Sequence, residues 1–135
     1  MHDILRNPDS RLRWHQKEQE IEEADVRPEF SQRDIWLCYL GINIGDEQNG
    51  SWEDFLRPIV IFRKFNSHVC LVIPLTRSNK EGYHYFSFNF VGFETSTAIL
   101  SQLRLIDARR LYTKIGFISH EDYFALKEKL RTLLS

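Results

Sequence analysis

Three polar side chains in or beside apolar stretches of this chain are of the types that bind and activate a phosphate group. Arg57 opens one apolar run, Thr76 closes the next, and Gln102 lies within a third. Runs of this length, rich in Val, Ile and aromatic residues, are typical of buried strands. A guanidinium, a hydroxyl and an amide held at strand ends and open to a ligand would form a phosphate receptor. Taken singly, each has a simpler structural interpretation: a surface arginine, a turn residue and a half-buried amide.

Length and composition limit the kinds of protein this chain can be. Its 135 residues fit one domain with an appendage, and 42% hydrophobic and 13% aromatic residues are enough for a core. The formal net charge of -1 argues against a general nucleic-acid coat protein, so any contact with nucleic acid has to be local. Residues 1–14 lack the apolar segment of a secretory signal, and no apolar run approaches membrane-spanning length. We therefore expect a cytoplasmic protein with no membrane partner.

The cysteines and histidines do not have the spacing of a metal or redox site. Cys38 and Cys70 lie inside apolar runs and lack C-x-x-C spacing, so we expect buried free thiols rather than a disulfide. The five histidines also lack ligand spacing, and His68 near Cys70 is better explained as a strand-edge residue than as a partial site. No metal and no cofactor are predicted.

Residues 1–32 differ from the rest and are predicted to form an N-terminal helical extension. Asn7 and Pro8 suit the N-cap and the first position of a helix that ends before Pro28. Its apolar stripe consists of Leu12, Trp14, Ile21 and Ala24. Because this stripe is weak, the helix should lie on the surface of the main domain or on a partner. The acidic run 18–23 is a binding face or a solvated face, and composition favours the second.

Residues 33–135 have the pattern of a small β domain. The predicted strands lie at residues 34–40, 57–64, 68–76, 83–90 and 97–106, with a long loop at 41–56 and a short helix at 107–112. Ser119, with Asp122 at the third position, forms a capping box that starts a C-terminal helix. The apolar stripe of this helix is Tyr123, Leu126, Leu130, Leu133 and Leu134. The predicted fold is mainly β: an antiparallel barrel closed by the C-terminal helix, with the N-terminal helix added.

Five short motifs occur in an order that resembles a known family. They are Gly45-Asp-Glu-Gln48, Arg57-Pro58, Pro74-Leu-Thr-Arg-Ser78, Gln102-Leu-Arg-Leu-Ile-Asp107 and Lys114-Ile-Gly116. Over residues 33–135 the chain resembles the MazF/PemK (Kid) toxins of bacterial type II toxin–antitoxin systems. The resemblance implies an SH3-like barrel of the MazF/PemK/CcdB type that forms a homodimer. It also implies a metal-independent, sequence-selective endoribonuclease that cleaves single-stranded RNA and is neutralised by a cognate antitoxin protein.

The resemblance assigns roles to the residues that match the family's motifs. Arg57 and Thr76 match the usual catalytic pair. Glu47 and Gln48 match the Glu-Gln pair of the first loop, and Gln102 matches the glutamine of the Gln-x-Arg strand. Metal-free cleavage uses the 2′-hydroxyl of the RNA as nucleophile, so Arg57 suits stabilisation of the phosphorane and Thr76 can donate to a non-bridging oxygen. Glu47 is either the general base or a loop residue that holds Gln48 in place.

Two features depart from the family. Residues 51–56 lengthen the first loop, which leaves the RNA sequence preference open. Ser101 and Ile99 stand where the PemK/Kid branch has an Asp and an Arg, and Asp46 replaces its first-loop His. The acid–base scheme of that branch therefore does not carry over, and Arg57 and Thr76 bear more of the chemistry.

A second set of residues is predicted to contact RNA. It comprises Gln48, Trp52, Arg77, Lys80, Ser101 and Gln102, with Lys64 as a further phosphate contact. Charged turn residues such as Arg77 and Lys80 are more often simply solvated. Trp52 and Phe55 are suited to stacking on single-stranded bases, although a loop folded over its own hydrophobic cluster is slightly favoured.

Two other functions remain open. In one, the chain is a non-catalytic SH3-like barrel that binds a protein, as the CcdB-type gyrase poisons do. In the other, it is a degenerate toxin retained as a binding domain. The pair Arg57 and Thr76 favours the nuclease, since a binding module does not require a phosphate receptor.

Overall fold

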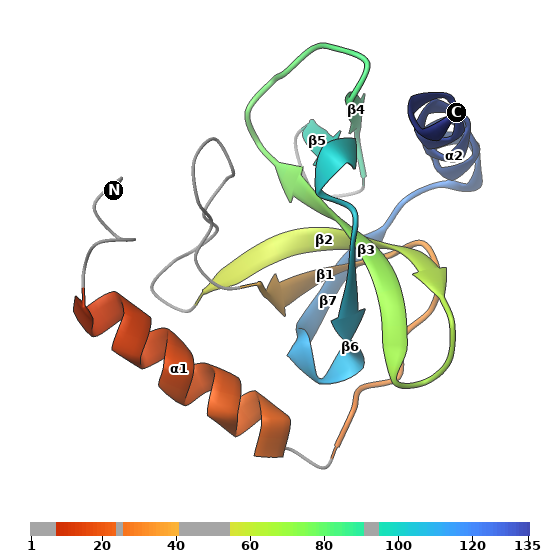
Figure 1. Ribbon diagram of the computed structural model, residues 1–135. Coiled ribbons are helices and arrows are strands. Elements are labelled where there is room, and N and C mark those ends of the chain that lie inside the picture. The colour runs from red at the N-terminus through yellow and green to blue at the C-terminus, as the bar shows by residue number, and fades with distance from the viewer. Residues whose placement is uncertain (1–7, 24–25, 41–54, 91–94) are drawn as a thin grey trace.

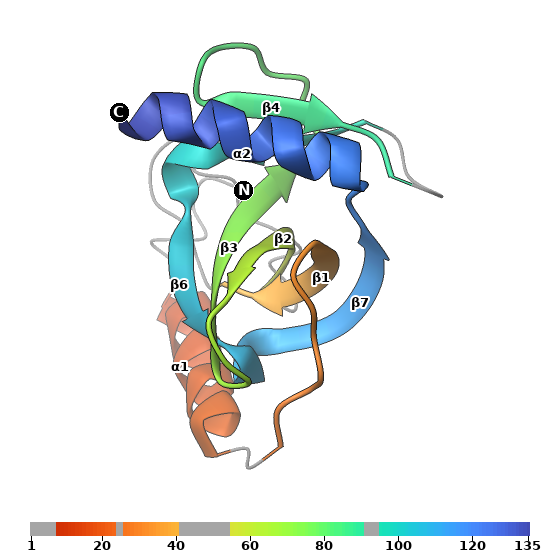
Figure 2. The same cartoon turned by 90° about the vertical axis from the view of Figure 1, so that its right-hand side faces the viewer.

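The structure is a computed structural model that describes residues 8–23, 26–40, 55–90 and 95–135. Along the chain they form α1 (Pro8–Glu23), β1 (Asp34–Tyr39), β2 (Leu56–Lys64), β3 (Val69–Thr76), β4 (Tyr85–Phe88), β5 (Ser96–Ile99), the 3₁₀ turn η2 (Leu100–Gln102), β6 (Arg104–Asp107), the 3₁₀ turn η3 (Ala108–Arg110), β7 (Leu111–Phe117) and α2 (His120–Leu134). The predicted mainly β fold is confirmed: the strands form an antiparallel barrel, with α1 and α2 at opposite ends (Figures 1 and 2).

The barrel is organised around β3, whose two edges have different neighbours. The strand order is β4-β5-β3-β2-β1-β7, and β6 also pairs with β3. One edge of β3 pairs with β2, whereas on the other edge β6 pairs with residues 69–72 and β5 with Leu75 and Thr76. Figure 2 shows the resulting ring of β6, β3, β2, β1 and β7, in which η3 joins the first strand to the last.

The stretch predicted as one strand at residues 97–106 is two strands separated by η2. Thr97 pairs with Thr76, and Arg104 pairs with Val72. The chain therefore advances by seven residues from Thr97 to Arg104 (104 − 97) while its partner β3 advances by only four from Val72 to Thr76 (76 − 72). The three extra residues form η2, and the chain turns there from one part of β3 to the other. The polar residues Ser101 and Gln102 lie at this corner, but two polar residues within an apolar run do not by themselves distinguish a corner from one continuous strand.

The short helix predicted at residues 107–112 is reduced to the 3₁₀ turn η3, and β7 begins at Leu111, within the predicted helix. Only η3 is helical, and β7 pairs with β1 from Asp34 to Cys38. Pairing with a central strand overrides the weak local preference of this segment. Gly116 is part of β7, and a Cβ atom there would lie 2.7 Å from Cδ2 of Phe90. The close approach of the Phe90 ring accounts for a glycine within the strand.

Two hydrophobic clusters lie on the two faces of the sheet. Side chains alternate along β2, so Ile59 and Ile61 belong to the barrel interior and Val60 to the face under α2. The interior cluster is Phe30, Trp36, Cys38, Leu40, Ile59, Ile61, Cys70, Val72, Ile106, Ala108 and Leu111. The cluster on the other face includes Leu126 and Leu130 of α2.

α2 begins as predicted. Oγ of Ser119 accepts the backbone N–H of Asp122 at 3.1 Å, which satisfies one of the free donors at the start of the helix. Oη of Tyr123 donates to the carbonyl oxygen of Phe62 at 2.7 Å and fixes the helix on β2. The assignment of Leu134 to the buried stripe is wrong, because this side chain is 70% exposed.

α1 packs on the barrel, which is one of the two locations predicted for it. The ring of Trp14 lies 5.2 Å from that of Phe55, and Ile21 is buried. The apolar stripe of α1 is only partly buried, since Leu12 is 59% exposed. The division of the chain at residue 32 stays a prediction.

Asp107 fastens the linker between α1 and β1 to the barrel. Nε and Nη2 of Arg27 donate to its two carboxylate oxygens at 3.2 and 3.1 Å, and Nε and Nη2 of Arg109 do the same at 3.1 and 3.1 Å. The backbone N–H of Arg109 adds a bond of 2.9 Å. Burial raises the pKa of the carboxyl, but the bonds from Arg109 and Arg27 outweigh burial and hold the pKa well below its usual range.

Asp107→Asn should lower the free energy of unfolding at pH 7 by about 1–2 kcal/mol, because it removes the charge that both guanidinium groups bind. A carboxyl whose pKa is lower in the folded state stabilises the fold above its unfolded pKa of about 3.9. This stabilisation is lost as the pH falls below about 4. Urea unfolding should therefore show a smaller difference between parent and variant at pH 3 than at pH 7. An equal difference at both pH values, or the same loss in the exposed control Glu81→Gln, would contradict this account.

Both cysteines are free and fully buried, as predicted. Burial raises the pKa of Cys38 to about 12 against the opposing charge of Arg110, and burial also raises the pKa of Cys70 to about 12. The thiols are therefore neutral and inaccessible in the folded protein. We expect a thiol reagent at pH 8 to modify neither residue until urea unfolds the chain, with mass spectrometry as the measurement. Labelling well before the unfolding transition would show that the barrel opens locally.

Candidate functional site

Arg57 and Thr76 lie on the same face of the sheet, at the same end of the barrel. β2 and β3 pair with Ile59 opposite Pro74, and continuing this register by two residues sets Arg57 opposite Thr76. Directly opposed residues of antiparallel strands point to one face, with Cβ atoms about 4.5–5.5 Å apart. On its other side Arg57 pairs with Cys38 of β1, whose side chain belongs to the interior cluster. The pair therefore faces the barrel interior where β2 begins and β3 ends; this region is called the barrel mouth below.

Both residues are less accessible than expected. Arg57 is 1% exposed, both of its terminal nitrogens are buried, and Thr76 is 7% exposed. The expectation that these groups are open to a ligand is therefore wrong for this conformation. In this conformation the guanidinium is closed off from solvent. The sheet holds the Arg57 guanidinium and the Thr76 hydroxyl in fixed positions, but both groups are buried.

The hydroxyl group of Thr76 has a defined orientation. Its Oγ1 accepts the backbone N–H of Ser78 at 3.2 Å, in the turn that follows β3. The hydroxyl proton must then point away from this donor. A hydroxyl fixed in this way is suited to donate a hydrogen bond to an anionic oxygen.

Two further hydroxyl residues continue the row across the sheet and were not identified from the sequence. Thr97 of β5 lies opposite Thr76, and Ser87 of β4 lies opposite Thr97. Oγ of Ser87 and Oγ1 of Thr97 are 2.8 Å apart, and Thr97 is 1% exposed. Only the non-local register brings these three hydroxyl groups together, so no local sequence pattern could have indicated them.

The predicted RNA contacts divide into three groups. Arg77, which is exposed, and Lys80, which is half-buried, follow β3 beyond Thr76. Ser101, which is exposed, and Gln102, which is half-buried, lie in η2 rather than in a strand, and η2 packs against β3 and β4. The third group, Glu47, Gln48 and Trp52, lies outside the described residues. Phe55 is buried, 4% exposed, and its ring packs against Trp14 of α1, a partner outside the loop cluster that was predicted.

Two arginines to which the sequence gave no RNA-binding role place positive charge near the barrel mouth. Burial raises the pKa of Cys38, and the charges of Arg110 and Arg104 act in the opposite direction. Both charges therefore act on Cys38, the residue that pairs with Arg57. Nη1 of Arg110 also donates to the carbonyl oxygen of Tyr39, at the end of β1, at 3.2 Å. Arg104 could have been noticed from its place in the Gln-x-Arg motif.

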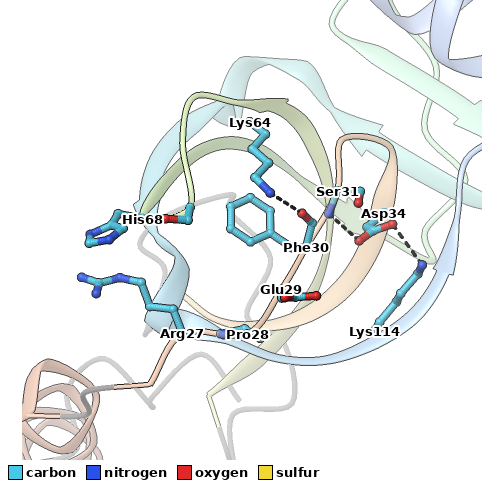
Figure 3. Close-up of a pocket in the computed structure, with 10 residues that line it drawn as sticks. Arg27, Pro28, Glu29, Phe30, Ser31, Asp34, Lys64, His68 and Lys114 are labelled. Atoms are coloured by element: carbon cyan, nitrogen blue, oxygen red, sulfur yellow. Dashed lines mark hydrogen bonds and ion pairs between the residues drawn. The ribbon is translucent and has the colours of Figure 1, made fainter.

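A pocket of about 620 Å³ lies at the other end of β2, between this strand, the hairpin after it and the linker to β1 (Figure 3). Its charged groups already serve the fold. Asp34 accepts the N–H of Ser31 at 2.8 Å and forms an ion pair of 3.1 Å with Lys114. Lys64 donates to the carbonyl oxygen of Phe30 at 2.8 Å, which places it far from Arg57 and removes it from the predicted phosphate contacts.

Within the described ranges, no three His, Cys, Asp or Glu side chains gather as a metal site would require. No helix among the described residues is long and apolar enough to cross a membrane.

Solved structures with a similar fold are bacterial toxins. A mycobacterial endoribonuclease in complex with its cognate antitoxin is 12% identical, with a TM-score of 0.62, 78% of this chain covered and 95% of the other. The toxin MazF-mt6 of Mycobacterium tuberculosis is 17% identical, with a TM-score of 0.58 and coverage of 76% and 96%. MazF of Deinococcus radiodurans (Form-I) is 16% identical, with a TM-score of 0.60 and coverage of 82% and 98%. At these identities the likeness establishes the fold, an SH3-like barrel of the MazF type.

Comparison of the sequence itself identifies the family. A search of curated proteins gives no match. Residues 31–134 match the family described as the PemK-like, MazF-like toxin of type II toxin–antitoxin systems. The match includes the barrel, α2 and every motif noted in the sequence, and it begins after α1 ends. This chain belongs to the PemK-like, MazF-like toxin family.

Proposed function

We propose that this toxin is a metal-independent endoribonuclease that cleaves single-stranded RNA, with mRNA as its substrate. The observation that carries the proposal is the placement of Arg57 and Thr76 on one face at the end of two paired strands. A guanidinium and a hydroxyl fixed by a sheet need little reorganisation when charge develops on a phosphorane. Pro58 adds to this rigidity, because it restricts the preceding Arg57 to an extended conformation. Membership of the family supports the same reaction.

In the proposed reaction the 2′-oxygen of the RNA attacks phosphorus and the bond to the 5′-oxygen breaks. Glu47 accepts the proton of the 2′-hydroxyl, a role that rests on the family resemblance. Arg57 stabilises the phosphorane and hydrogen-bonds the leaving 5′-oxygen, which takes up a proton from solvent. Thr76 donates to a non-bridging oxygen, and its bond from Ser78 leaves the hydroxyl proton directed for this. The products are a 2′,3′-cyclic phosphate and a 5′-hydroxyl.

The proposed endoribonuclease needs contacts to RNA, a protein partner and a cellular location. Gln48, Trp52, Arg77, Lys80, Ser101 and Gln102 are proposed to contact the RNA strand. A cognate antitoxin is the proposed protein partner, since a neighbour of this fold was solved with its own antitoxin. The cytoplasm is the proposed location, because mRNA is found there and the two free thiols suit a reducing compartment.

One observation favours a second candidate function. Arg57 and Thr76 are almost fully buried, as expected for a barrel that acts by binding a protein and has no use for an accessible phosphate receptor. The cleavage test below separates the two candidates.

The parent protein should cut a mixed-sequence RNA into discrete fragments in the presence of a metal chelator, and should leave the corresponding DNA intact because it lacks the 2′-hydroxyl. Arg57→Lys and Arg57→Met, which nearly preserve side-chain length in a buried site, should lower the cleavage rate by about 10²–10³. Lysine fails because a point charge does not reproduce the planar fork of arginine. Gel analysis of end-labelled RNA measures the rates, and thermal unfolding checks the fold.

The matched control is Arg63→Ala, which removes an exposed arginine from the other end of the same strand and should leave the rate unchanged. Cleavage by Arg57→Met at the parental rate would refute the catalytic assignment. Activity that disappears with chelator and returns with magnesium would refute the metal-independent reaction. A folded parent protein that cuts no RNA would favour the protein-binding barrel.

A homodimer is proposed on the basis of the family and of exposed apolar side chains. Phe124 and Leu134 on α2 are 65% and 70% exposed, and Leu105 on β6 is 57% exposed. Sedimentation equilibrium at micromolar concentration should give twice the 16.1 kDa mass of the chain. A monomer with full cleavage activity would contradict the proposal.

A further inference from the structure

The charges of α1 are segregated along its length. In residues 11–17, called the basic half below, the charged side chains are Arg11, Arg13 and Lys17; in residues 18–23, called the acidic half, they are Glu18, Glu20, Glu22 and Glu23, and Asp9 precedes both. In a chain of net charge -1, this order gathers three cations on one stretch of the helix.

The acidic half lies against the arginines of η3. Glu18 forms an ion pair of 3.5 Å with Arg110, and the carbonyl oxygen of Glu22 accepts a hydrogen bond from Arg109. These contacts hold the helix on the barrel. They also give its acidic residues a structural role, so the solvated face predicted for residues 18–23 is only partly solvated.

The basic half lies against aromatic rings that border the barrel mouth. The guanidinium of Arg13 is 5.3 Å from the ring centroid of Phe55, and Nζ of Lys17 is 5.0 Å from that of Tyr39. Phe55 precedes Arg57 by two residues, so their Cα atoms are at most about 7 Å apart. Tyr39 follows Cys38, the residue that pairs with Arg57, although its side chain alternates to the other face of β1. Two cations of α1 therefore lie near the end of β2 that carries Arg57.

A hollow of about 220 Å³ separates this half of the helix from the barrel, lined by Arg13, Gln16, Lys17, Glu20 and Phe55. Arg13, Lys17 and the amide of Gln16 can donate to an anion, whereas the carboxylate of Glu20 repels one, and the hollow is large enough for a phosphate with part of its sugar. A single-stranded polyanion that places one phosphate at Arg57 carries further phosphates to either side of it.

We propose that Arg13 and Lys17 of α1 bind a phosphate of the RNA strand that flanks the scissile phosphate. The inference rests on the proposed endoribonuclease function and adds a subsite outside residues 31–134, the region matched by the family. α1 thereby lengthens the RNA-binding surface in a chain that has no general basic surface. The subsite raises affinity for RNA long enough to reach it and leaves the chemical step unchanged.

Substitution of Glu20 distinguishes phosphate binding in the hollow from an effect on the packing of α1. It lies in the same hollow and forms an ion pair of 3.2 Å with Lys17. If the hollow binds a phosphate, Lys17→Gln weakens RNA binding because it removes a positive charge. Glu20→Gln strengthens binding, because it removes a repelling charge and releases Lys17. If the ion pair only supports the helix, both substitutions break the same contact and act in the same direction.

The experiment measures binding of 2′-O-methyl RNA, which lacks the attacking hydroxyl, to the full chain by fluorescence anisotropy. We use a mixed-sequence 20-mer and a mixed-sequence 4-mer at several salt concentrations. For the 20-mer, Lys17→Gln and Arg13→Gln should each raise Kd by about two- to fivefold, and Glu20→Gln should lower it by a similar factor. The slope of log Kd against log salt should fall by about 0.7 for each lost phosphate contact. The 4-mer should show none of these changes.

The matched control is the ion pair of Arg131 and Glu128 on α2, which has the same i,i+3 spacing and a separation of 3.3 Å. Arg131→Gln and Glu128→Gln lie at the opposite end of the barrel and should leave Kd unchanged. Equal-sign effects of Lys17→Gln and Glu20→Gln, or equal effects on both RNA lengths, would overturn the inference. If Arg57 variants lose cleavage while the α1 variants bind like the parent, the subsite alone is refuted. If the parent neither binds nor cuts RNA, the proposed function fails first.

Discussion

The antiparallel register of β2 and β3 is the constraint on which the candidate site depends. It sets Arg57 opposite Thr76 through the neighbouring pair of Ile59 and Pro74. Because side chains alternate along a strand, a slip of one residue would turn Arg57 to the face under α2 and separate it from Thr76. The same slip would exchange the buried residues Ile59 and Val60 between the two clusters. Core packing and the placement of Arg57 opposite Thr76 therefore require the same register.

The burial of Arg57 gives this arrangement both its strength and its limitation. Removing a guanidinium from water is costly, and its surroundings must compensate. Once held there, the charge acts in a medium of low polarity, where its effect on a phosphate is larger than at a solvated surface. The limitation is access, since the conformation described here encloses both Arg57 and Thr76. Under the proposed function, a phosphate reaches this pair only after the barrel mouth opens.

The sequence predicted those parts of the structure that depend on local pattern. Arg57 and Thr76 could be identified because each marks an end of a long apolar run, and the cap at Ser119 because it needs only three residues. The corner at η2 could not be predicted, since it arises from the two partners of β3, and the polar residues Ser101 and Gln102 are equally compatible with one continuous strand. The strand β7 was missed for a similar reason, because its partner β1 lies far away in the sequence. For the candidate site, local pattern singled out Arg57 and Thr76, whereas Thr97, Ser87 and the charges from α1 depend on contacts between distant segments.

The contact between Gly116 and Phe90 links two distant positions of the barrel. A methyl group at residue 116 would need space that the Phe90 ring occupies, and the aromatic ring in turn fills the space left by the missing side chain. Substitution at either position alone creates overlap or a void, whereas a larger residue at 116 combined with a smaller one at 90 preserves the total volume. Selection should therefore act on the pair and not on either residue alone. Among related toxins the two positions are expected to covary, with glycine accompanying an aromatic residue and alanine or serine accompanying a smaller aliphatic one.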